Sequence, residues 1–515
     1  MKKLLWSVTT LAISATLLNT LPRADAAAVV SKAQYSEIVW GVCPAAPTDI
    51  LVDPRQTCGT LKVPLDYRHP GGKKIKIAVS RIPASNPEKR RGVLLLNPGG
   101  PGGEGLNLPS EFGGLASKTV LDSYDRIGFD PRGVGHSSPV TCGLVEAEVM
   151  PPNPFPALDG SIGKNVDYAR SAAARCNARS GDVLPFITTA NAARDMDQIR
   201  QALGERQLSY WGASYGTYLG AVYASLFSHH TDRMVLDSAL DPTRIWYDVF
   251  RQQSEGMAAR LPDAARYAAE HADEIKFGNT SAAVTKSYLK LATRLDIRPM
   301  TVPGTSTTLT GNVFRYLSYD LLYQDAAIPP LTHAWRAAAD LADGHATDDQ
   351  ASLLREILRV IAPSVTTSPG VPKDNSTAAA YATICDDVHW PRNVHVYAHN
   401  VAKDREEFPL SAGFPANIWP CAFWPTAPVE PAVTISGQGP RNIMILQNER
   451  DPATSLASGQ GMRKALGARS TLVTVDAGGH GVYGMQGQQA CATKATDAFL
   501  VDGTMPSQDV HCPQP

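Results

Sequence analysis

The sequence has almost no net charge and lacks any long tract of one charge sign. Its 48 Lys and Arg nearly balance its 49 Asp and Glu, which leaves a formal net charge of −1 at pH 7. The basic clusters at 73–76 and 89–91 are short. Proteins that bind nucleic acid or anionic membranes through charge usually carry a clear basic excess. The composition therefore predicts no nucleic-acid partner.

Long apolar stretches are also absent after the N-terminus. There, Lys2 and Lys3 precede an uncharged, mostly apolar run at 4–18, and Ala24-Asp25-Ala26 follows. This order is typical of a signal peptide cleaved after Ala26. A membrane anchor is the alternative, but the run is short for a bilayer span and no lipid-anchor cysteine accompanies it. We predict that residues 1–26 are a signal peptide, and that the mature protein is secreted, extracellular and without a membrane partner.

A Cys-x-x-Cys motif is missing, which argues against a zinc or redox site. The chain has eight cysteines, and an even number in an exported protein indicates disulfides. Sequence alone cannot fix their pairing, but the cysteines fall into four neighbouring couples along the chain. On that basis we predict the disulfides Cys43–Cys58, Cys142–Cys176, Cys385–Cys421 and Cys491–Cys512.

The organisation of the 515 residues is that of an α/β core with a helical insertion. Short apolar runs alternate with helical patterns in the first part of the chain and again near its end, as in a parallel sheet covered by helices. The intervening part loses this alternation and is rich in Ala and charge at helical spacing. We expect core segments at 27–240 and 431–515, and a helical lid at 241–430. Candidate strands are 93–97, 208–211, 233–237, 442–447 and 471–475, and candidate helices are 195–203 and 217–227.

One short motif points to a nucleophile. Gly212-Ala213-Ser214-Tyr215-Gly216 matches G-x-S-x-G, follows a candidate strand and opens a candidate helix. This context is that of a nucleophile elbow, in which a tight turn lifts the serine oxygen clear of a sheet. The glycines are needed because crowded backbones leave no room for a Cβ. A Gly- and Ser-rich loop without function is the alternative interpretation.

A serine nucleophile needs a base, and the base needs a carboxylate to orient it. In the α/β-hydrolase fold the chain order is Ser, then Asp or Glu, then His. Asp451 and His480 fit this order, because each follows a candidate strand. Glu449 is the competing acid. His395 and His399 have helical spacing without the Glu of a metalloprotease motif.

The oxyanion of acyl transfer needs two backbone donors. We predict the N–H of Tyr215 and that of Gly100, which lies in the glycine-rich loop 97–103 after a candidate strand. A phosphate-binding loop is the rival interpretation, but the loop lacks a Gly-Lys-Ser/Thr ending. The polar turn 130–137 is interpreted as structural, with Asp130 and Arg132 tying loops together near the site.

These motifs together resemble the secreted tripeptidyl aminopeptidases of actinomycetes, within the proline iminopeptidase-like α/β-hydrolases. The resemblance covers nearly the whole mature chain and is carried by 58–67, 97–103, 128–135, 214–220, the surroundings of Asp451 and His480, and the tail 491–512. It implies an α/β-hydrolase fold and removal of tripeptides from free N-termini, without metal or cofactor. Some relatives are described as esterases. One departure is Glu104, where family members have Ser, which bears on the shape and charge of the entrance.

An exopeptidase must also bind the substrate's free ammonium. Asp386 and Asp387 in the lid, and Glu104, are our candidates, with ordinary lid surface as the alternative. We expect a monomeric enzyme that acts on peptide or protein N-termini. The competing hypotheses are a carboxylesterase with the same triad and a non-catalytic binding protein on a hydrolase fold.

Overall fold

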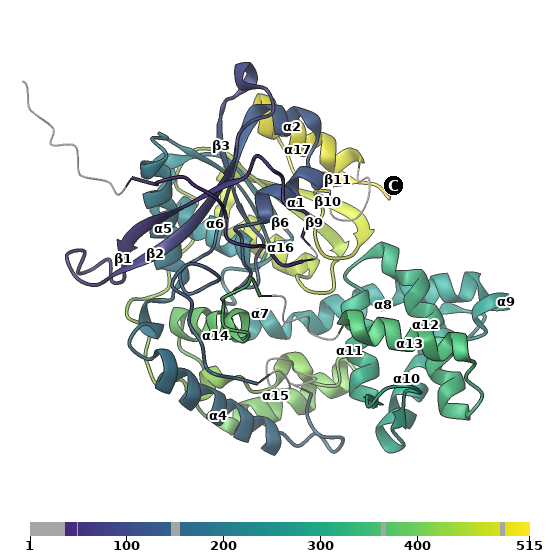
Figure 1. Cartoon of the computed structure of the whole chain (residues 1–515). Coiled ribbons are helices and arrows are strands. Elements are labelled where there is room, and N and C mark those ends of the chain that lie inside the picture. The colour runs from purple at the N-terminus through teal and green to yellow at the C-terminus, as the bar shows by residue number, and fades with distance from the viewer. Residues whose placement is uncertain (1–36, 49, 146–154, 362–366, 485–489, 515) are drawn as a thin grey trace, which may run out of the picture. The chain divides into compact units, whose positions relative to one another are not determined.

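A large, mostly parallel sheet organises the protein. The structure is a computed structural model that describes residues 37–48, 50–145, 155–361, 367–484 and 490–514, and among these residues the sheet has nine strands (Figure 1). The predicted signal peptide lies outside the described residues. The order is β1-β2-β4-β3-β5-β6-β9-β10-β11, in which β2 is antiparallel to both its neighbours and the other pairs are parallel. The strands are β1 (Thr57–Pro64), β2 (Lys74–Ile82), β3 (Gly92–Asn97), β4 (Tyr124–Phe129), β5 (Leu208–Ala213), β6 (Thr231–Asp237), β9 (Ile443–Arg450), β10 (Ser470–Gly478) and β11 (Val510–Cys512).

The candidate strands of the sequence are all present, as β3, β5, β6, β9 and β10. They form the middle of the sheet, where strands covered on both faces need continuous apolar runs. In their register, Leu95 of β3 lies opposite Ile127 of β4 and Tyr210 of β5. Because neighbouring strands are parallel, their carboxyl ends meet at one edge of the sheet. The loops that leave this edge carry the predicted site.

Helices cover the sheet. Thr188 caps α5, since its side chain accepts a hydrogen bond from the N–H of Asn191. The helix predicted at 195–203 is therefore the later part of a longer helix, and α5 packs against α6, the helix that follows the elbow. The covering helices are α1 (Leu108–Leu115), α2 (Lys118–Ser123), α5 (Thr189–Ala202), α6 (Tyr215–Leu226), α16 (Leu456–Leu466) and α17 (Ala490–Asp502), whereas α4 (Gly163–Ser180) packs against the 3₁₀ turn Pro420–Phe423.

The chain between β6 and β9 adds helices and contributes no described strand to the large sheet. It divides by packing into two segments. The first segment, residues 253–361, has its own apolar cluster, in which Trp335 and Leu331 are fully buried, and Figure 1 shows its helices gathered together. It contains α8 (Gln253–Glu270), α9 (Ala272–Ile275), α10 (Ser281–Ile297), the hairpin of β7 (Met300–Thr301) and β8 (Thr308–Leu309), α11 (Gly311–Leu321), α12 (Ile328–Asp343) and α13 (Asp348–Ile361).

Most of the second segment, residues 367–424, belongs instead to the apolar cluster of the main sheet, although Leu410 packs in the cluster of the first segment. Tyr397 and Ile384 pack in that cluster together with residues of α4, α5 and α6. Its helices are α14 (Asn375–Asp387) and α15 (Val394–Glu407), and α7 (Tyr247–Arg251) precedes the first segment. The helices between β6 and β9 thus form two differently packed parts, and the predicted division into core and lid stays a prediction.

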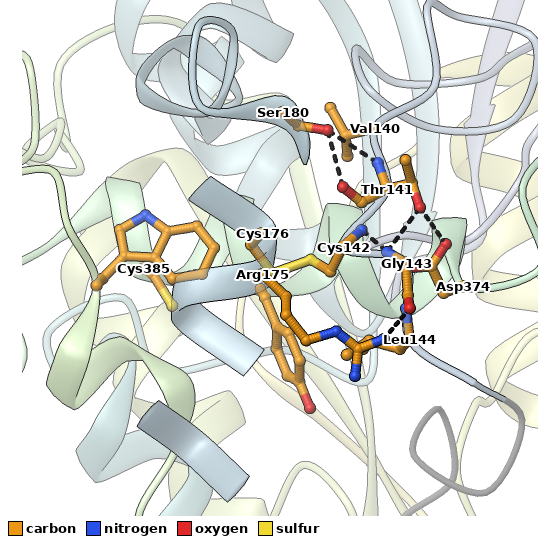
Figure 2. Close-up of a disulfide and its surroundings, with 12 residues drawn as sticks. Val140, Thr141, Cys142, Gly143, Leu144, Arg175, Cys176, Ser180, Asp374 and Cys385 are labelled. Carbon is orange, nitrogen blue, oxygen red and sulfur yellow. Dashed lines mark hydrogen bonds between the residues drawn. A yellow bond between two sulfur atoms is a disulfide. The ribbon is translucent and has the colours of Figure 1, made fainter. Parts of the chain in front are cut away.

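The described cysteines form the disulfides Cys43–Cys58, Cys142–Cys176, Cys385–Cys421 and Cys491–Cys512, which confirms the predicted pairing. Figure 2 shows the surroundings of Cys142–Cys176. There, Asp374 at the start of α14 accepts hydrogen bonds from the N–H groups of Cys142 and Leu144 and from the hydroxyl of Thr141, at 2.6–3.0 Å. This carboxylate therefore ties the second segment to the loop that the disulfide anchors on α4.

No helix in the described part of the chain is both long enough and apolar enough to cross a membrane.

Candidate active site

The turn at Ser214 has the geometry that its motif predicts. Ser214 stands between β5 and α6 with φ 56° and ψ −122°, a conformation that the surroundings must hold in place. Its N–H donates to the carbonyl of Asp237 at 2.9 Å. An ideal Cβ on Gly212 would lie 2.4 Å from the hydroxyl oxygen of Tyr210, so only glycine fits there. Ser214 itself is half-buried.

Asp451 and His480 form a closely bonded pair. Nδ1 of His480 lies 3.0 and 2.9 Å from the two carboxylate oxygens of Asp451, which is fully buried. The carboxylate also accepts hydrogen bonds from the N–H groups of Ala453 and Thr454 and from the Thr454 hydroxyl, which fix its orientation. Burial acts to lower the pKa of His480, but the charge and hydrogen bond of Asp451, aided by Asp237, outweigh it and raise that pKa.

The competing acid, Glu449, pairs elsewhere. Its carboxylate lies 3.0 Å from Nδ1 of His511 in β11. Glu449 lies within β9, whereas Asp451 lies in the loop that follows this strand. The side chain of Asp451 reaches His480 from that loop. The structure therefore brings Asp451, and not Glu449, to the imidazole.

Asp237, at the end of β6, links the serine turn to the histidine loop. Its carbonyl accepts from Ser214, while its carboxylate accepts from the N–H groups of Val482 and Tyr483, at 2.8 and 2.9 Å. The hydroxyl of Ser238 accepts the N–H of Gly481. Burial raises the pKa of Asp237 to about 6. Sequence reasoning missed this residue, and its position at a strand end is the signal that would find it.

The glycine-rich loop passes beside the serine. An ideal Cβ on Gly99 would lie 3.0 Å from the Cβ of Ser214 and 3.2 Å from the nitrogen of Tyr215. The φ of Gly99 is 97° and that of Gly100 is 112°, values that favour glycine. Tyr215 is the first residue of α6, where backbone N–H groups have no partner within the helix. Tyr215 thus follows Ser214 directly, and the loop that contains Gly100 passes beside the serine through Gly99.

The turn 130–137 is structural, as its interpretation from the sequence expects. Asp130 accepts hydrogen bonds from the N–H groups of Gly105, Leu106 and His136, at 2.8–3.0 Å. Arg132 forms a two-pronged ion pair with buried Asp195 of α5. These contacts hold the loop after β3 and the helix α5 against the same turn.

Two of the carboxylates predicted to bind an ammonium are buried and accept hydrogen bonds from the protein. Asp386 accepts from the indole of Trp424 at 2.8 Å and from the hydroxyl of Thr426 at 2.6 Å. Asp387 accepts from the N–H and hydroxyl of Thr189 and from the indole of Trp246, at 2.6–3.0 Å. Burial raises the pKa of Asp386 to about 7 and that of Asp387 to about 6.

The third predicted carboxylate, Glu104, is half-buried in the loop after β3. It accepts hydrogen bonds from the backbone N–H and the hydroxyl of Ser368. All three candidates thus serve protein donors, and the predicted role in binding a substrate ammonium stays a prediction.

The first segment reaches the histidine through Tyr323, which sequence reasoning also missed. Its carbonyl accepts the N–H of His480 at 2.8 Å, and its ring packs edge-on against the imidazole with centroids 5.2 Å apart. Its hydroxyl lies 2.8 Å from that of Tyr319. A tyrosine at the end of α11 is therefore part of the wall beside the predicted base.

The described residues contain no group of three or more His, Cys, Asp or Glu side chains placed to hold a metal ion.

The strand order and the serine turn define the class of protein, the α/β-hydrolases. A family model described as alpha/beta hydrolase fold matches residues 92–299, and one described as TAP-like protein matches residues 410–512. A tripeptidyl aminopeptidase of Streptomyces lividans is 34% identical over 498 residues, which are 95% of this chain and 88% of that protein. The chain therefore belongs to the tripeptidyl aminopeptidase family of α/β-hydrolases.

Two further relatives extend the comparison. Serine protease Hip1 of Mycobacterium tuberculosis is 27% identical over 495 residues, covering 92% of this chain and 91% of that protein. Carboxylesterase B of Mycobacterium tuberculosis is 30% identical over 500 residues, covering 92% and 89%. The names of these relatives include both a protease and an esterase.

Proposed function

We propose that this protein is a serine exopeptidase that releases tripeptides from the free N-termini of peptides and proteins. The observation that carries the proposal is the bonded pair of Asp451 and His480, which Asp237 links to the strained turn at Ser214. Relatives named tripeptidyl aminopeptidase and serine protease support this reaction.

In this mechanism, His480 takes the proton of the Ser214 hydroxyl as its oxygen attacks the carbonyl carbon of the third residue. Asp451 orients the imidazole and stabilises the imidazolium. His480 then gives the proton to the leaving amine, and a water molecule hydrolyses the acyl-enzyme by the same steps. The three side chains supply nucleophile, base and charge, so the proposal requires no metal or cofactor.

The negative oxygen of the tetrahedral intermediate would be bound by the N–H groups of Tyr215 and Gly100. The close approach of Gly99 to Ser214 and to the nitrogen of Tyr215 supports this assignment. Donors fixed in advance at such a position stabilise the transition state more than the ground state. The helix dipole of α6 adds to this effect at Tyr215.

A free N-terminus would be required because an ammonium buried at a closed end of the cleft needs an opposite charge and hydrogen bonds. Three extended residues span about 10 Å, so an anchor at that distance from Ser214 would select tripeptides. Asp386, Asp387 and Glu104 are the carboxylates proposed from the sequence for this anchor.

The test is a comparison of kcat/KM on free and N-acetylated tripeptide anilides. Acetylation removes the charge and adds bulk, so we expect a loss of at least tenfold, equivalent to about 1.4 kcal/mol. Equal rates on the two substrates would exclude the exopeptidase function.

A carboxylesterase is the second candidate, favoured by the 30% identity to a protein of that name. It would share the triad and need no ammonium site. Higher kcat/KM on simple acyl esters than on free tripeptide anilides would favour it.

We also propose that the enzyme is exported and acts as a monomer. The signal-peptide pattern at 1–26 and the disulfides support export. N-terminal sequencing of the protein from the culture medium should begin at Ala27, and light scattering should give the mass of one chain.

A further inference from the structure

Asp320, near the end of α11, has a carboxylate without a protein partner. Its side chain is half-buried, and within the described residues it forms no hydrogen bond or ion pair. Burial raises its pKa to about 6, so most of it is still ionised at neutral pH. Desolvating a carboxylate costs free energy unless a cation or hydrogen-bond donors compensate. A ligand that brings a positive charge or hydrogen-bond donors to Asp320 would offset this cost.

The neighbours of Asp320 on its helix suit a cationic ligand. Tyr316 and Asp320 are spaced i and i+4 on one face of α11, and Tyr323 lies in the turn just after the C-cap Leu322. Tyr316 and Tyr323 are both half-buried, and burial followed by the Asp320 charge raises the pKa of Tyr316 to about 12. Aromatic faces attract ammonium groups, so a carboxylate between two tyrosines favours a cation over an anion or an apolar group.

This face points to the predicted base. The ring of Tyr323 lies against the imidazole of His480, with centroids 5.2 Å apart. The N–H of Tyr323 donates to the carbonyl of Asp320 at 3.2 Å, so Asp320 lies one turn before the residue that packs on the imidazole. An extended tripeptide spans about 10 Å, the length that an anchor for the amine has to match. Both Asp451 and Asp320 act on Tyr323, so the field along this face is negative.

We propose that Asp320 binds the free ammonium group of the substrate's first residue, with the rings of Tyr316 and Tyr323 beside it. The inference rests on the proposed exopeptidase function and names the anchor that sets its tripeptide length. Asp386, Asp387 and Glu104 already accept hydrogen bonds from protein groups, whereas the half-buried carboxylate of Asp320 accepts none within the described residues.

The experiment compares the wild-type protein with Asp320→Asn, which removes the charge and keeps the shape. The matched control is Asp349→Asn, the same change at an exposed position of α13 in the same segment. For each protein, kcat/KM is measured on a tripeptide anilide with a free amine and on its N-acetylated form. We expect the ratio of the two to fall at least tenfold in Asp320→Asn and to stay at the wild-type value in Asp349→Asn.

The outcomes separate the two levels of the proposal. A wild-type ratio near one would remove the exopeptidase function, and the role of Asp320 with it. A high wild-type ratio that Asp320→Asn retains would overturn the role of Asp320 alone, leaving the proposed function in place.

A binding measurement guards against a variant that is merely damaged. Trialanine with a free amine, used as a competitive inhibitor of anilide hydrolysis, should bind at least tenfold more weakly to Asp320→Asn, while N-acetyl-trialanine should bind both proteins alike. Asp320→Ser is prepared in parallel, and the melting temperature of each variant is recorded. If both folded variants bind free trialanine as tightly as the wild type, Asp320 is not the anchor.

Discussion

The two segments of the insertion are held to the rest of the protein in different ways. The first, residues 253–361, makes charged contacts with it: Asp263 of α8 accepts a hydrogen bond from Arg450 of β9 at 2.8 Å, and Arg260 of the same helix also donates to Asp263, at 2.6 Å. Arg450 also pairs with Asp476 of β10. An ideal Cβ on Gly478 would overlap the guanidinium of Arg260, which explains a glycine there. The apolar cluster of this segment is mostly its own, with Leu410 of the second segment added.

The second segment, residues 367–424, is tied by apolar packing and by buried polar bonds. Its side chains complete the cluster around α4, α5 and α6. Asp374 and Asp387 bond to residues far away in the chain, and the disulfide Cys385–Cys421 closes the segment on itself. Its carboxylates therefore have structural partners.

This difference suggests that one segment mainly stabilises the fold and that the other mainly contacts the substrate. Charged contacts at a partly solvated junction contribute modestly, whereas apolar burial and a disulfide contribute more. The second segment packs around the serine turn, and the first places Tyr323 against the histidine. We expect substitutions in the second segment to change stability and those in the first to change substrate use.

The largest expected effect provides the baseline for this comparison. Ser214→Ala should lower turnover by several orders of magnitude, because the nucleophile is lost and only binding and oxyanion stabilisation remain. Both segments should stay folded, with unchanged hydrogen exchange. Near-normal rates in a folded Ser214→Ala protein would disprove the mechanism.

The second-largest expected effect is on the pair of Asp451 and His480, which Tyr323 of the first segment contacts. Asp451→Asn should lower kcat roughly 10⁴-fold, because the imidazole loses its orienting carboxylate. In the wild type, kcat/KM should fall as pH decreases, because protonation removes the base. Its midpoint should lie above the usual histidine value of about 6.5, since the pKa of His480 is raised.

Glu449→Gln is the matched control, since that carboxylate pairs with His511. It should keep nearly wild-type kcat. If Glu449→Gln lost most of its kcat while Asp451→Asn kept it, the acid of the triad would be Glu449 and not Asp451.

The disulfide of the second segment tests how that segment is supported. Replacing both Cys385 and Cys421 with Ala should lower the free energy of unfolding by about 3 kcal/mol, because a closed loop is released in the unfolded chain. Denaturant melts measure this change. Thiol titration of the denatured, unreduced wild type should find no free cysteine, and hydrogen exchange should rise mainly in 367–424. A rise confined to 253–361 would contradict the comparison.

The smallest expected effect is at the charged junction. Arg450→Gln should lower the free energy of unfolding by about 1 kcal/mol, since the partly solvated Arg450 loses Asp476 and Asp263 while Arg260 still neutralises Asp263. The junction positions the first segment. We therefore expect the loss in kcat/KM on tripeptide anilides, converted to a free energy, to exceed the loss in the free energy of unfolding. A variant less stable than the cysteine double mutant would reverse the order of the two segments.

The sequence predicts the middle of the sheet and the triad candidates because both depend on local patterns. Strands covered on both faces are continuous apolar runs, and the catalytic candidates follow their ends in a fixed chain order. The strand β4 escapes this reasoning because it contains Asp125 and Arg126, which are buried and paired. Arg126 donates to the carbonyl of Pro109, and Asp125 binds Arg81 and Arg90.

The carboxylates of the lid were beyond sequence reasoning for a different reason. Asp387 resembles any surface acid at a helix end, yet its partners Thr189 and Trp246 are 198 and 141 residues away in the chain. Such partners depend on tertiary packing alone. The carboxylate of Asp320 had a local signal, a tyrosine on either side of it at positions 316 and 323, although only the contact of Tyr323 with His480 gives that signal meaning.

The hydrogen bond from the N–H of His480 to the carbonyl of Tyr323 makes the histidine loop partly dependent on the first segment. If that segment moves away to admit a chain, the imidazole loses both a backbone restraint and the ring packed against it. The packing of the first segment therefore bears directly on the orientation of the predicted base.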